Sequence, residues 1–324
     1  MAGRARVVVV GSFNVDHVWH CADLPPPGAT LAGDYASGPG GKGFNQAVAA
    51  ARVGASTSFV CALGDDAGAE LARGLALADG IDLRAQRSDA PTGTAGIFVD
   101  ARGRNSIVIG AGANASLSAD FVAGQGDAID AAAVVLAQLE SPAAAIARAL
   151  RDARAAGAIA ILNPAPANAR ASPELLSLAG ILTPNETEFA SLLATHADLR
   201  IDADAVAGSD DARLHALARR LLPHGTVLLT LGAAGLFVSH AQGALRGDSA
   251  ACYRLAAEPT EVVDTTGAGD ACNGALAASL ALRPEAPFHA HARFANRYAA
   301  LSTERAGAAL AMPRRSDFDA RFRD

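Results

Sequence analysis

Residues 262–282 read VVDTTGAGDACNGALAASLAL, and this stretch does more than any other to decide the fold. Two apolar residues lead into a polar, glycine-rich turn, and the turn leads into an alanine-rich segment that predicts a helix over 270–282. The glycines allow consecutive backbone N–H groups to face one point at the start of this helix, where negative charge is attracted. The stretch therefore predicts an α/β connection that carries an anion site.

Asp270 lies in the first turn of the predicted helix, and two interpretations of it are open. In the first, the carboxylate only compensates the helix dipole, an effect worth under about 1 kcal/mol. In the second, the helix terminus holds the carboxylate ionised, ready to accept a hydroxyl proton while the amides of the turn bind a phosphoryl group. Phosphoryl transfer to an alcohol requires this pairing of a base with an anion hole.

Outward from this stretch, short β-branched runs alternate with segments rich in alanine and leucine. The predicted buried strands are 6–10, 58–63, 133–139, 158–162, 180–183 and 226–231. The predicted helices are 46–53, 67–78, 142–156, 186–194, 212–222, 270–282 and 288–305, with a short one near Asp317. Strand–helix alternation implies a mostly parallel sheet with helices on both faces, which is a three-layer α/β/α fold.

Two stretches, 16–38 and 91–110, break this alternation, because they carry turn residues and short alternating strands. We expect them to meet as one small, discontinuous β lid over the main sheet, whose open face needs cover from substrate closure or a second subunit. The main domain would then comprise 1–15, 39–90 and 111–324. The acidic segment 198–212 predicts a surface loop.

Polar residues recur just past the carboxyl ends of the predicted strands. In open α/β sheets ligands bind outside these ends, so the recurrence favours a ligand cleft, although each residue alone is typical of a turn. The residues concerned are Asn14, Asp16, Gln138, Glu140, Asn163, Asn185, Glu188, Thr230 and Gly232.

The segment GPGGKG at 38–43 contains a formal GxGxxG motif, but no buried strand precedes it, so a dinucleotide site is not indicated. A Walker A loop is excluded as well, because Gly43 follows Lys42 where Ser or Thr is required. What the motif predicts is a glycine-rich approach to a helix that begins near Phe44 or Asn45. Backbone amides there, with Lys42 and Asn45, can bind an anion or hydroxyls. The alternative is a flexible turn.

Asn185 and Glu188 have two explanations that can hold together. The spacing TPNETE at 183–188 is nearly that of a capping box, and capping is slightly favoured. The same two side chains could also orient water molecules on Mg²⁺.

Composition bounds the class of protein. The 324 residues suffice for one large α/β domain or two smaller ones. The net charge of −6 disfavours binding of a phosphate backbone, so we expect no nucleic-acid partner. The four cysteines form no CxxC pair, which argues against a zinc site or disulfide scaffold and fits a reducing, cytoplasmic compartment. We also expect no membrane partner, because no apolar run approaches about 18 residues.

The chain resembles the ribokinase-like sugar kinases, the PfkB carbohydrate kinase family, over almost its whole length. The motifs that carry the resemblance are GSFNVDH at 11–17, GGKGFNQAVAAARVGA at 40–55, GANASLS at 112–118, QLESP at 138–142, NPAPA at 163–167, TPNETE at 183–188, TLGAAG at 230–235 and DTTGAGDACNGAL at 264–276. They stand in the order and spacing of the family.

The resemblance implies an ATP-dependent kinase that phosphorylates D-ribose at O5, as in D-ribose catabolism. Asp270 would be the general base, and Gly267, Ala268 and Gly269 would supply the anion hole. The sugar-binding residues implied are Asn14, Asp16, Gly40, Gly41, Lys42, Asn45, Glu140 and Asp270. The nucleotide-binding residues implied are Asn185, Thr230, Gly232, Gly235, Gly269 and Asn296.

The resemblance also implies metal ions and a partner. Asn185 and Glu188 would hold Mg²⁺ through water. A monovalent cation, usually potassium, would bind at Asp264 and Thr266 with help from Thr303 and Gly307. The small sheet would act as a lid, and the chain would form a homodimer through it.

Four residues depart from the family pattern, and alternatives to ribose stay open. Phe44 and Ala311 replace a small residue and a serine, while Arg297 and Tyr298 are bulky near the expected adenine site. Phe44 is expected to be a buried helix residue, but it could also be a wall for a flat ligand and stack on a base, so a nucleoside or a different furanose is an alternative substrate. A non-catalytic sugar-binding protein is a third possibility, disfavoured because a binder needs neither Asp270 nor the turn amides.

Overall fold

The run RVVVV at 6–10 forms β1 (Arg6–Val10) in the interior of a nine-stranded sheet, in a computed structural model that describes residues 5–322. Side chains alternate between the two faces of a strand. Accordingly, Val7 and Val9 belong to one hydrophobic core, and Val8 and Val10 belong to the other. A strand buried on both faces explains why Val7–Val10 are all apolar.

The sheet has the order β13-β12-β11-β10-β9-β8-β1-β4-β5. Neighbouring strands are parallel except for the pairs β11–β12 and β12–β13, which are antiparallel. Beside β1, its strands are β4 (Ser56–Leu63), β5 (Asp82–Arg87), β8 (Val134–Ala137), β9 (Ile159–Leu162), β10 (Ile181–Leu182), β11 (Thr226–Thr230), β12 (Leu236–His240) and β13 (Cys252–Leu255).

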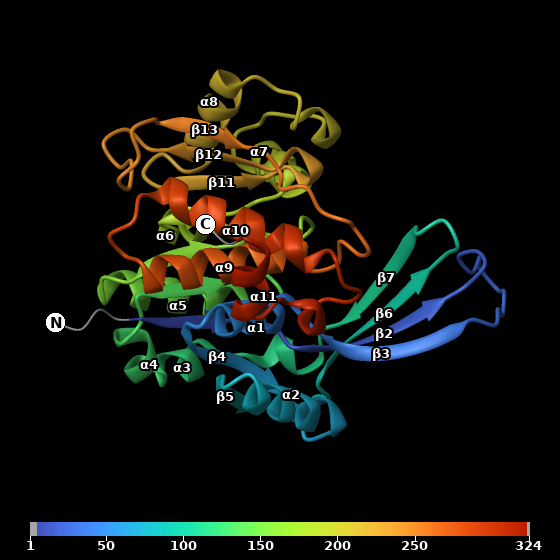
Figure 1. Ribbon diagram of the computed structural model, residues 1–324. Coiled ribbons are helices and arrows are strands. Elements are labelled where there is room, and N and C mark those ends of the chain that lie inside the picture. Colours follow the sequence, from blue (N-terminus) through green and yellow to red (C-terminus); the bar gives the residue numbers. More distant parts are fainter. Residues whose placement is uncertain (1–4, 323–324) are drawn as a thin grey trace.

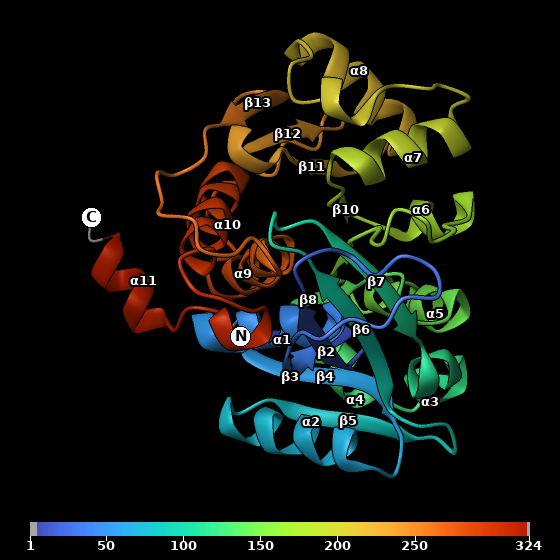
Figure 2. The ribbon, with the colours of Figure 1, turned by 90° about the vertical axis from the view of Figure 1, so that its right-hand side faces the viewer.

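Helices cover both faces of this sheet (Figures 1 and 2). The first core packs α1 (Lys42–Val53), α2 (Ala67–Ala78), α9 (Ala268–Leu282), α10 (Phe288–Ser302) and α11 (Arg315–Arg321). The second core packs α3 (Ala119–Ala123), α4 (Gly126–Asp130), α5 (Ala143–Ala155), α6 (Pro173–Leu178), α7 (Glu186–His196) and α8 (Asp211–Leu221). The expected three-layer α/β/α fold is confirmed.

A second sheet projects from the side of the carboxyl ends of the main strands (Figure 1). It has four strands in the order β3-β2-β6-β7, namely β2 (Asn14–His20), β3 (Asp34–Gly40), β6 (Gly93–Val99) and β7 (Asn105–Gly110). The predicted meeting of the two irregular stretches is confirmed, because β2 pairs in parallel with β6. Residues 1–4 and 323–324, at the ends of the predicted main domain, lie outside the described residues.

Some expectations about single elements were wrong. α1 begins at Lys42 rather than near Phe44. Gly41 is its N-cap, with a φ of 85°, and the Gly41 carbonyl accepts a hydrogen bond from the backbone N–H of Asn45. The edge strand β5, with sequence DLRAQR, and the strands β12 and β13 were not predicted. Within the expected loop 198–212, Val206 is buried in the second core and α8 already begins at Asp211.

In the described part of the chain, no helix has the length and apolarity needed to cross a membrane.

Candidate active site

Asp270 lies in the first turn of α9 and is 7% exposed. Asn45 Nδ2 donates to its Oδ2 at 2.9 Å, and Gln46 Nε2 donates to its Oδ1 at 2.9 Å. Burial raises the pKa of Asp270, while the charge of Lys42 and the two amide hydrogen bonds favour the ionised form. Two donors from α1 thus fix the orientation of a buried carboxylate.

Gln46 is a site residue that the sequence analysis missed. Its Nε2 donates to Asn163 Oδ1 at 3.1 Å as well as to Asp270, and Gln138 Nε2 donates to its Oε1. Asn163 Nδ2 in turn donates to the carbonyl of Thr183 at 2.8 Å. The strand-end residues Gln138 and Asn163 therefore support the carboxylate through Gln46. The available signal was the pair of amide residues Asn45-Gln46 in the first turns of α1, of which only Asn45 was predicted to bind a ligand.

Lys42 is the only lysine in the sequence, and it faces three carboxylates. Burial alone would lower the pKa of Lys42, but Asp270, Glu140 and Glu188 raise it. Its backbone N–H donates to Glu140 Oε2 at 3.0 Å, which fixes the first residue of α1. The site therefore holds one compact cation that stays protonated at neutral pH.

Asp16 and Glu140 form an acidic pair beside Lys42. Burial, followed by the charges of Glu140 and Asp270, raises the pKa of Asp16 to about 7. Ser12 Oγ donates to Glu140 Oε2 at 2.6 Å, which orients that carboxylate. A Cβ on Gly40 would lie 2.1 Å from Asp16 Oδ2, so only glycine leaves room for the Asp16 carboxylate there.

Asn14 is buried at the junction of the two sheets. Asn114 Nδ2 donates to Asn14 Oδ1 at 2.8 Å and to the Phe13 carbonyl at 3.0 Å. Phe13 N–H donates back to Asn114 Oδ1 at 3.0 Å. Asn114, another residue that was not predicted, therefore holds Asn14 in place.

The structure brings the glycine-rich turn, Asp270 and Lys42 to one pocket of about 170 Å³. Its lining includes Lys42, Asn163, Thr183, Asn185, Glu188, Thr230, Gly267, Gly269, Asp270 and Asn273. The Ala268 N–H donates to the Thr265 carbonyl at 3.1 Å, so it already has a partner in the turn. The N–H groups of Gly269 and Asp270 have no backbone acceptor among residues 5–322. The turn that carries these open amides therefore borders a pocket that also holds a carboxylate and a cation.

A larger groove of about 620 Å³ opens beside this pocket. All six residues predicted to bind nucleotide line it: Asn185, Thr230, Gly232, Gly235, Gly269 and Asn296. Asn296 Nδ2 donates to the Ala256 carbonyl at 2.7 Å, which anchors the loop along one wall. The groove and the smaller pocket share Asn185, Thr230 and Gly269, so they are continuous.

The bulky residues Arg297 and Tyr298 are absent from the lining of this groove. Arg297 Nε donates to Glu258 Oε1 at 2.8 Å and the guanidinium lies over the Phe322 ring. Tyr298 is buried in the core, and its hydroxyl donates to the Pro313 carbonyl. These two departures from the family pattern therefore leave the groove open.

Phe44 does not line a binding pocket. Its ring is 1% exposed and packs edge-on against Phe13, with a centroid distance of 5.1 Å, and against Phe59 at 5.8 Å. The alternative that Phe44 stacks on a nucleoside base is therefore wrong, because its position on α1 turns the ring into the core.

The predicted capping box of α7 is complete. Glu188 N–H donates to Asn185 Oδ1 at 2.8 Å, and Asn185 N–H donates to Glu188 Oε2 at 2.9 Å. Burial raises the pKa of Glu188, which the cap hydrogen bond and Lys42 oppose. Capping uses one oxygen of Glu188, and the residue still lines the small pocket.

Asp264 joins two loops on the far side of the turn. Thr266 N–H donates to its Oδ1 and Gly307 N–H to its Oδ2, both at 2.9 Å. The Thr303 carbonyl accepts from Val263 and Asp264 N–H. Burial would raise the pKa of Asp264, but these hydrogen bonds lower it. The four residues expected at the monovalent cation site thus lie together. Ala311 is buried in the turn Ala309–Ala311.

Comparisons with known proteins agree with this geometry. A model of the pfkB family carbohydrate kinases matches residues 4–315. The ribokinase of Haemophilus influenzae is 37% identical over 319 residues, covering 97% of each chain. The solved ribokinase of Giardia lamblia superposes with a TM-score of 0.85 at 29% identity, covering 98% of each chain. The Arabidopsis thaliana ribokinase, solved with ribose and ATP, gives 0.83 at 29% identity, also covering 98% of each chain. The chain therefore belongs to the pfkB family of carbohydrate kinases.

Proposed function

We propose that this chain is a ribokinase, which transfers the γ-phosphoryl group of ATP to the O5 hydroxyl of D-ribose. The observation that carries the proposal is the position of Asp270. Its buried carboxylate, fixed by Asn45 and Gln46, lies where the small pocket meets the turn that ends at Gly269. An alcohol bound against it would face a phosphoryl group held at the turn.

In this mechanism Asp270 orients the attacking hydroxyl and accepts its proton late, because phosphoryl transfer passes through a loose transition state. A sugar hydroxyl is too weak an acid to be deprotonated beforehand. Lys42 neutralises charge that develops on the transferred group, and the open amides of Gly269 and Asp270 stabilise its oxygens. Most of the acceleration then comes from positioning and charge stabilisation.

The sugar would lie among Asn14, Asp16, Gly41, Asn45 and Glu140. The Oδ1 atom of Asn45 is buried without a hydrogen-bond partner in the described structure, as a ligand-binding oxygen would be. Because a buried polar atom normally has a partner, this oxygen indicates a donor that arrives with the substrate. The carboxylates of Asp16 and Glu140 suit two further hydroxyls.

ATP would occupy the groove of about 620 Å³, with its phosphates directed to the turn at Gly267–Gly269. Thr230, Gly232 and Gly235 lie on one side of this groove and Asn296 lies on the other. The groove is mostly apolar near Ala299 and Ala300, which suits the flat face of a base.

Magnesium would be held through water at Asn185 and Glu188. The residues fit this role, because Glu188 keeps Oε1 for a water molecule while Oε2 is engaged in the cap. Among residues 5–322, no three His, Cys, Asp or Glu side chains gather as a direct ligand set. Mg²⁺ commonly keeps several waters and binds through one or two carboxylates and the substrate phosphates. When bound, it would neutralise charge on the phosphates.

A monovalent cation, potassium by expectation, would bind near Asp264, Thr266, Thr303 and Gly307. The residues fit this role, because the hydrogen bonds that lower the pKa of Asp264 keep its carboxylate ionised, and the Thr303 carbonyl lies beside it. The cation would hold the two loops that flank the turn. We expect turnover to rise when potassium replaces sodium at equal ionic strength, and equal rates in the two salts would refute the assignment.

We further propose that the chain divides into the main domain and the small sheet, which acts as a lid and as a dimer surface. The edge strand β7 presents Ile107, Val108 and Ile109 at 50%, 67% and 48% exposure. An open apolar edge strand pairs readily unless it is covered. Val108→Arg should reduce the dimer to monomer by light scattering, whereas Leu77→Arg on α2 should leave it intact. A monomeric parent chain would contradict the proposal.

The deciding experiment is ADP release across pentoses, hexoses and nucleosides, with the product position assigned by NMR. We expect the highest kcat/KM with D-ribose and the phosphate on C5. A higher value with another furanose or a nucleoside would change the substrate but keep the kinase. Sugar binding with no ADP release from any acceptor would indicate a non-catalytic binding protein.

A further inference from the structure

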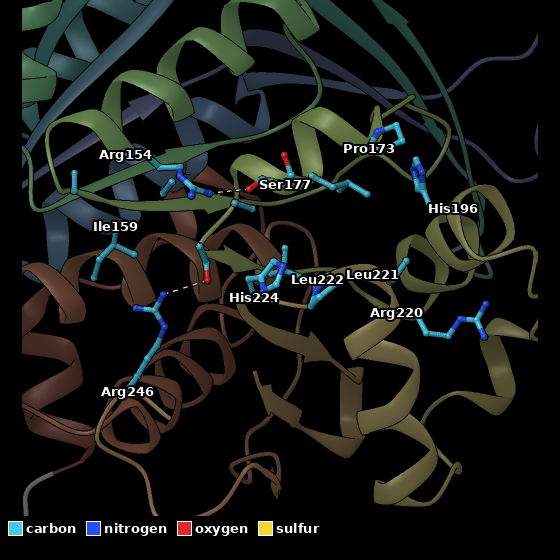
Figure 3. Close-up of a pocket in the computed structure, with 16 residues that line it drawn as sticks. Arg154, Ile159, Pro173, Ser177, His196, Arg220, Leu221, Leu222, His224 and Arg246 are labelled. Carbon is cyan, nitrogen blue, oxygen red and sulfur yellow. Dashed lines mark hydrogen bonds between the residues drawn. The ribbon is translucent and has the colours of Figure 1, made fainter. Parts of the chain in front are cut away.

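A second pocket, of about 560 Å³, lies at the amino ends of strands in the middle of the main sheet (Figure 3). Residues at or just before the first residue of β9, β10 and β11 line it, among them Ile159, Gly180 and His224. The candidate active site lies past the carboxyl ends of the same strands. A four-residue strand spans about 13 Å, so the two pockets are separate sites.

Three arginines and two histidines line this pocket, and no aspartate or glutamate does. Arg154 donates to the Ser177 carbonyl at 2.7 Å and Arg220 to the Ala197 carbonyl at 3.2 Å. Arg246 donates to the Gly180 carbonyl at 3.1 Å and to Thr226 Oγ1 at 3.0 Å. Within residues 5–322, none of the three guanidinium groups forms an ion pair with a carboxylate. Their charge is therefore uncompensated, in a chain of net charge −6.

Arg246 is held in an unusual backbone conformation. Its φ is +50°, and only one other non-glycine residue in the described chain, Asp198, has a positive φ. Glycine adopts this region without strain, whereas Arg246 is held in it by the hydrogen bonds of its guanidinium to Gly180 and Thr226. In Figure 3 the Arg246 side chain approaches the pocket from the side opposite Arg154, and its guanidinium donates to the Gly180 carbonyl.

An unpaired polar atom lies at the other end of the pocket. His196 Nε2 is buried and has no hydrogen-bond partner in the described structure. A buried imidazole nitrogen without a partner is costly unless a ligand or water supplies one. This observation is independent of the arginines and indicates a polar partner, either a ligand or a water molecule, for this nitrogen.

We propose that this pocket binds a small organic phosphate. A phosphate monoester carries close to two negative charges at neutral pH, which suits Arg154 and Arg246 better than a ligand with a single carboxylate does, because neither guanidinium forms an ion pair with the residues that the structure describes. Guanidinium forks bind phosphate oxygens in a bidentate manner. The pocket is larger than a phosphate ion, and Pro173, Leu176 and Leu222 offer an apolar wall for the organic part. This inference does not depend on the proposed sugar kinase activity.

The test is calorimetric titration of the full chain with its active site filled by D-ribose and a non-hydrolysable ATP analogue. The probes are glucose 6-phosphate, AMP, inorganic phosphate and citrate. We expect at least one of the two organic phosphates to bind more tightly than inorganic phosphate or citrate. Arg154→Ala should weaken this binding roughly tenfold, the scale of one charge-assisted contact. Arg151→Ala, on the same helix but outside the pocket lining, should leave it unchanged.

Arg154 is exposed, so its replacement should not unfold the chain, and thermal unfolding of both variants checks this. Four outcomes would overturn the proposal. They are no binding of either organic phosphate at millimolar concentration, equal binding by inorganic phosphate, tighter binding of citrate, and an Arg154→Ala variant that binds as well as the parent chain.

Discussion

Gln46 Nε2 donates to Asp270 Oδ1 at 2.9 Å, although the two residues lie 224 positions apart in the chain. The oxygen of the same amide accepts from Gln138, so the amide cannot turn over without losing that bond. Gln46 therefore presents a fixed donor to the carboxylate proposed as the base. With Asp270 proposed as the base, we propose Gln46 as a positioning residue that acts on the reaction through Asp270.

Replacing Gln46 by glutamate should test this role. Gln46→Glu removes the donor and brings a second carboxylate against Asp270, which raises the pKa of Asp270 and disturbs its orientation. We expect kcat to fall by about 10–100-fold, within the scale of general-base effects, with a smaller change in KM for ATP. The acid limb of the kcat–pH profile should move to higher pH. Gln242→Glu, in an exposed loop, is the matched control, and an unmoved profile would exclude the positioning role.

Removing the proposed base, Asp270, should have a larger effect than replacing Gln46. Asp270→Asn should reduce kcat by about 10²–10⁴, because the attacking hydroxyl loses its proton acceptor. KM for ATP should change little, since the groove does not depend on this carboxylate. Asp89→Asn, at an exposed position, serves as control. Near-normal turnover of a folded Asp270→Asn chain would show that another group is the base.

Lys42 should set the protonation of Asp270 as well as contribute charge. Lys42→Met removes the cation that favours the carboxylate, so the pKa of Asp270 should rise further and the acid limb of kcat should shift to higher pH. We expect kcat to fall by about 10²-fold, the scale of losing one electrostatic contact to the transition state. Lys42→Arg keeps the charge and should restore the position of the limb. An acid limb of kcat that stays in place in Lys42→Met would show that Lys42 does not control the protonation of Asp270.

Sugar affinity should depend on pH through Asp16. The pKa of Asp16 is raised to about 7, so the carboxylate is ionised above that pH and protonated below it. An ionised carboxylate accepts hydrogen bonds from two hydroxyls, whereas the protonated form loses acceptor capacity. KM for D-ribose should therefore fall as pH rises through 7, while KM for ATP stays flat. In Asp16→Asn the dependence should vanish. A dependence that persists in this variant would assign the titration to another group.

Gly41 should be intolerant of any side chain. Its φ is +85°, and a Cβ would lie 2.8 Å from the Asn14 backbone nitrogen. Gly41→Ala should lower the free energy of unfolding by about 1–3 kcal/mol and reduce activity, because the start of α1 must shift. Gly74, in α2, has open space around it, and Gly74→Ala should stabilise the chain by roughly 0.5–1 kcal/mol. Chemical denaturation of both variants measures the difference, and equal stabilities would contradict the strain argument.

The local sequence pattern was enough to predict those helices and strands that depend on neighbouring residues alone. The continuous run at 6–10 marked β1 as buried on both faces, and the helix over 67–78 was predicted with its observed bounds. The polar edge strand β5 escaped detection, because an edge strand that is only partly buried carries no apolar period. The start of α1 was misplaced, because it depends on the left-handed conformation of Gly41.

The sequence alone determined the three-layer fold, the first-turn position of Asp270 and the cap of α7 by Asn185 and Glu188. These follow from hydrophobic period, glycine spacing and contacts three residues apart, all of which are local. Only the tertiary structure decided that Gln46 orients the carboxylate and that Phe44 turns into the core. Those outcomes depend on which strands become neighbours in the sheet and on how α1 packs against α9, and no local pattern encodes such distances.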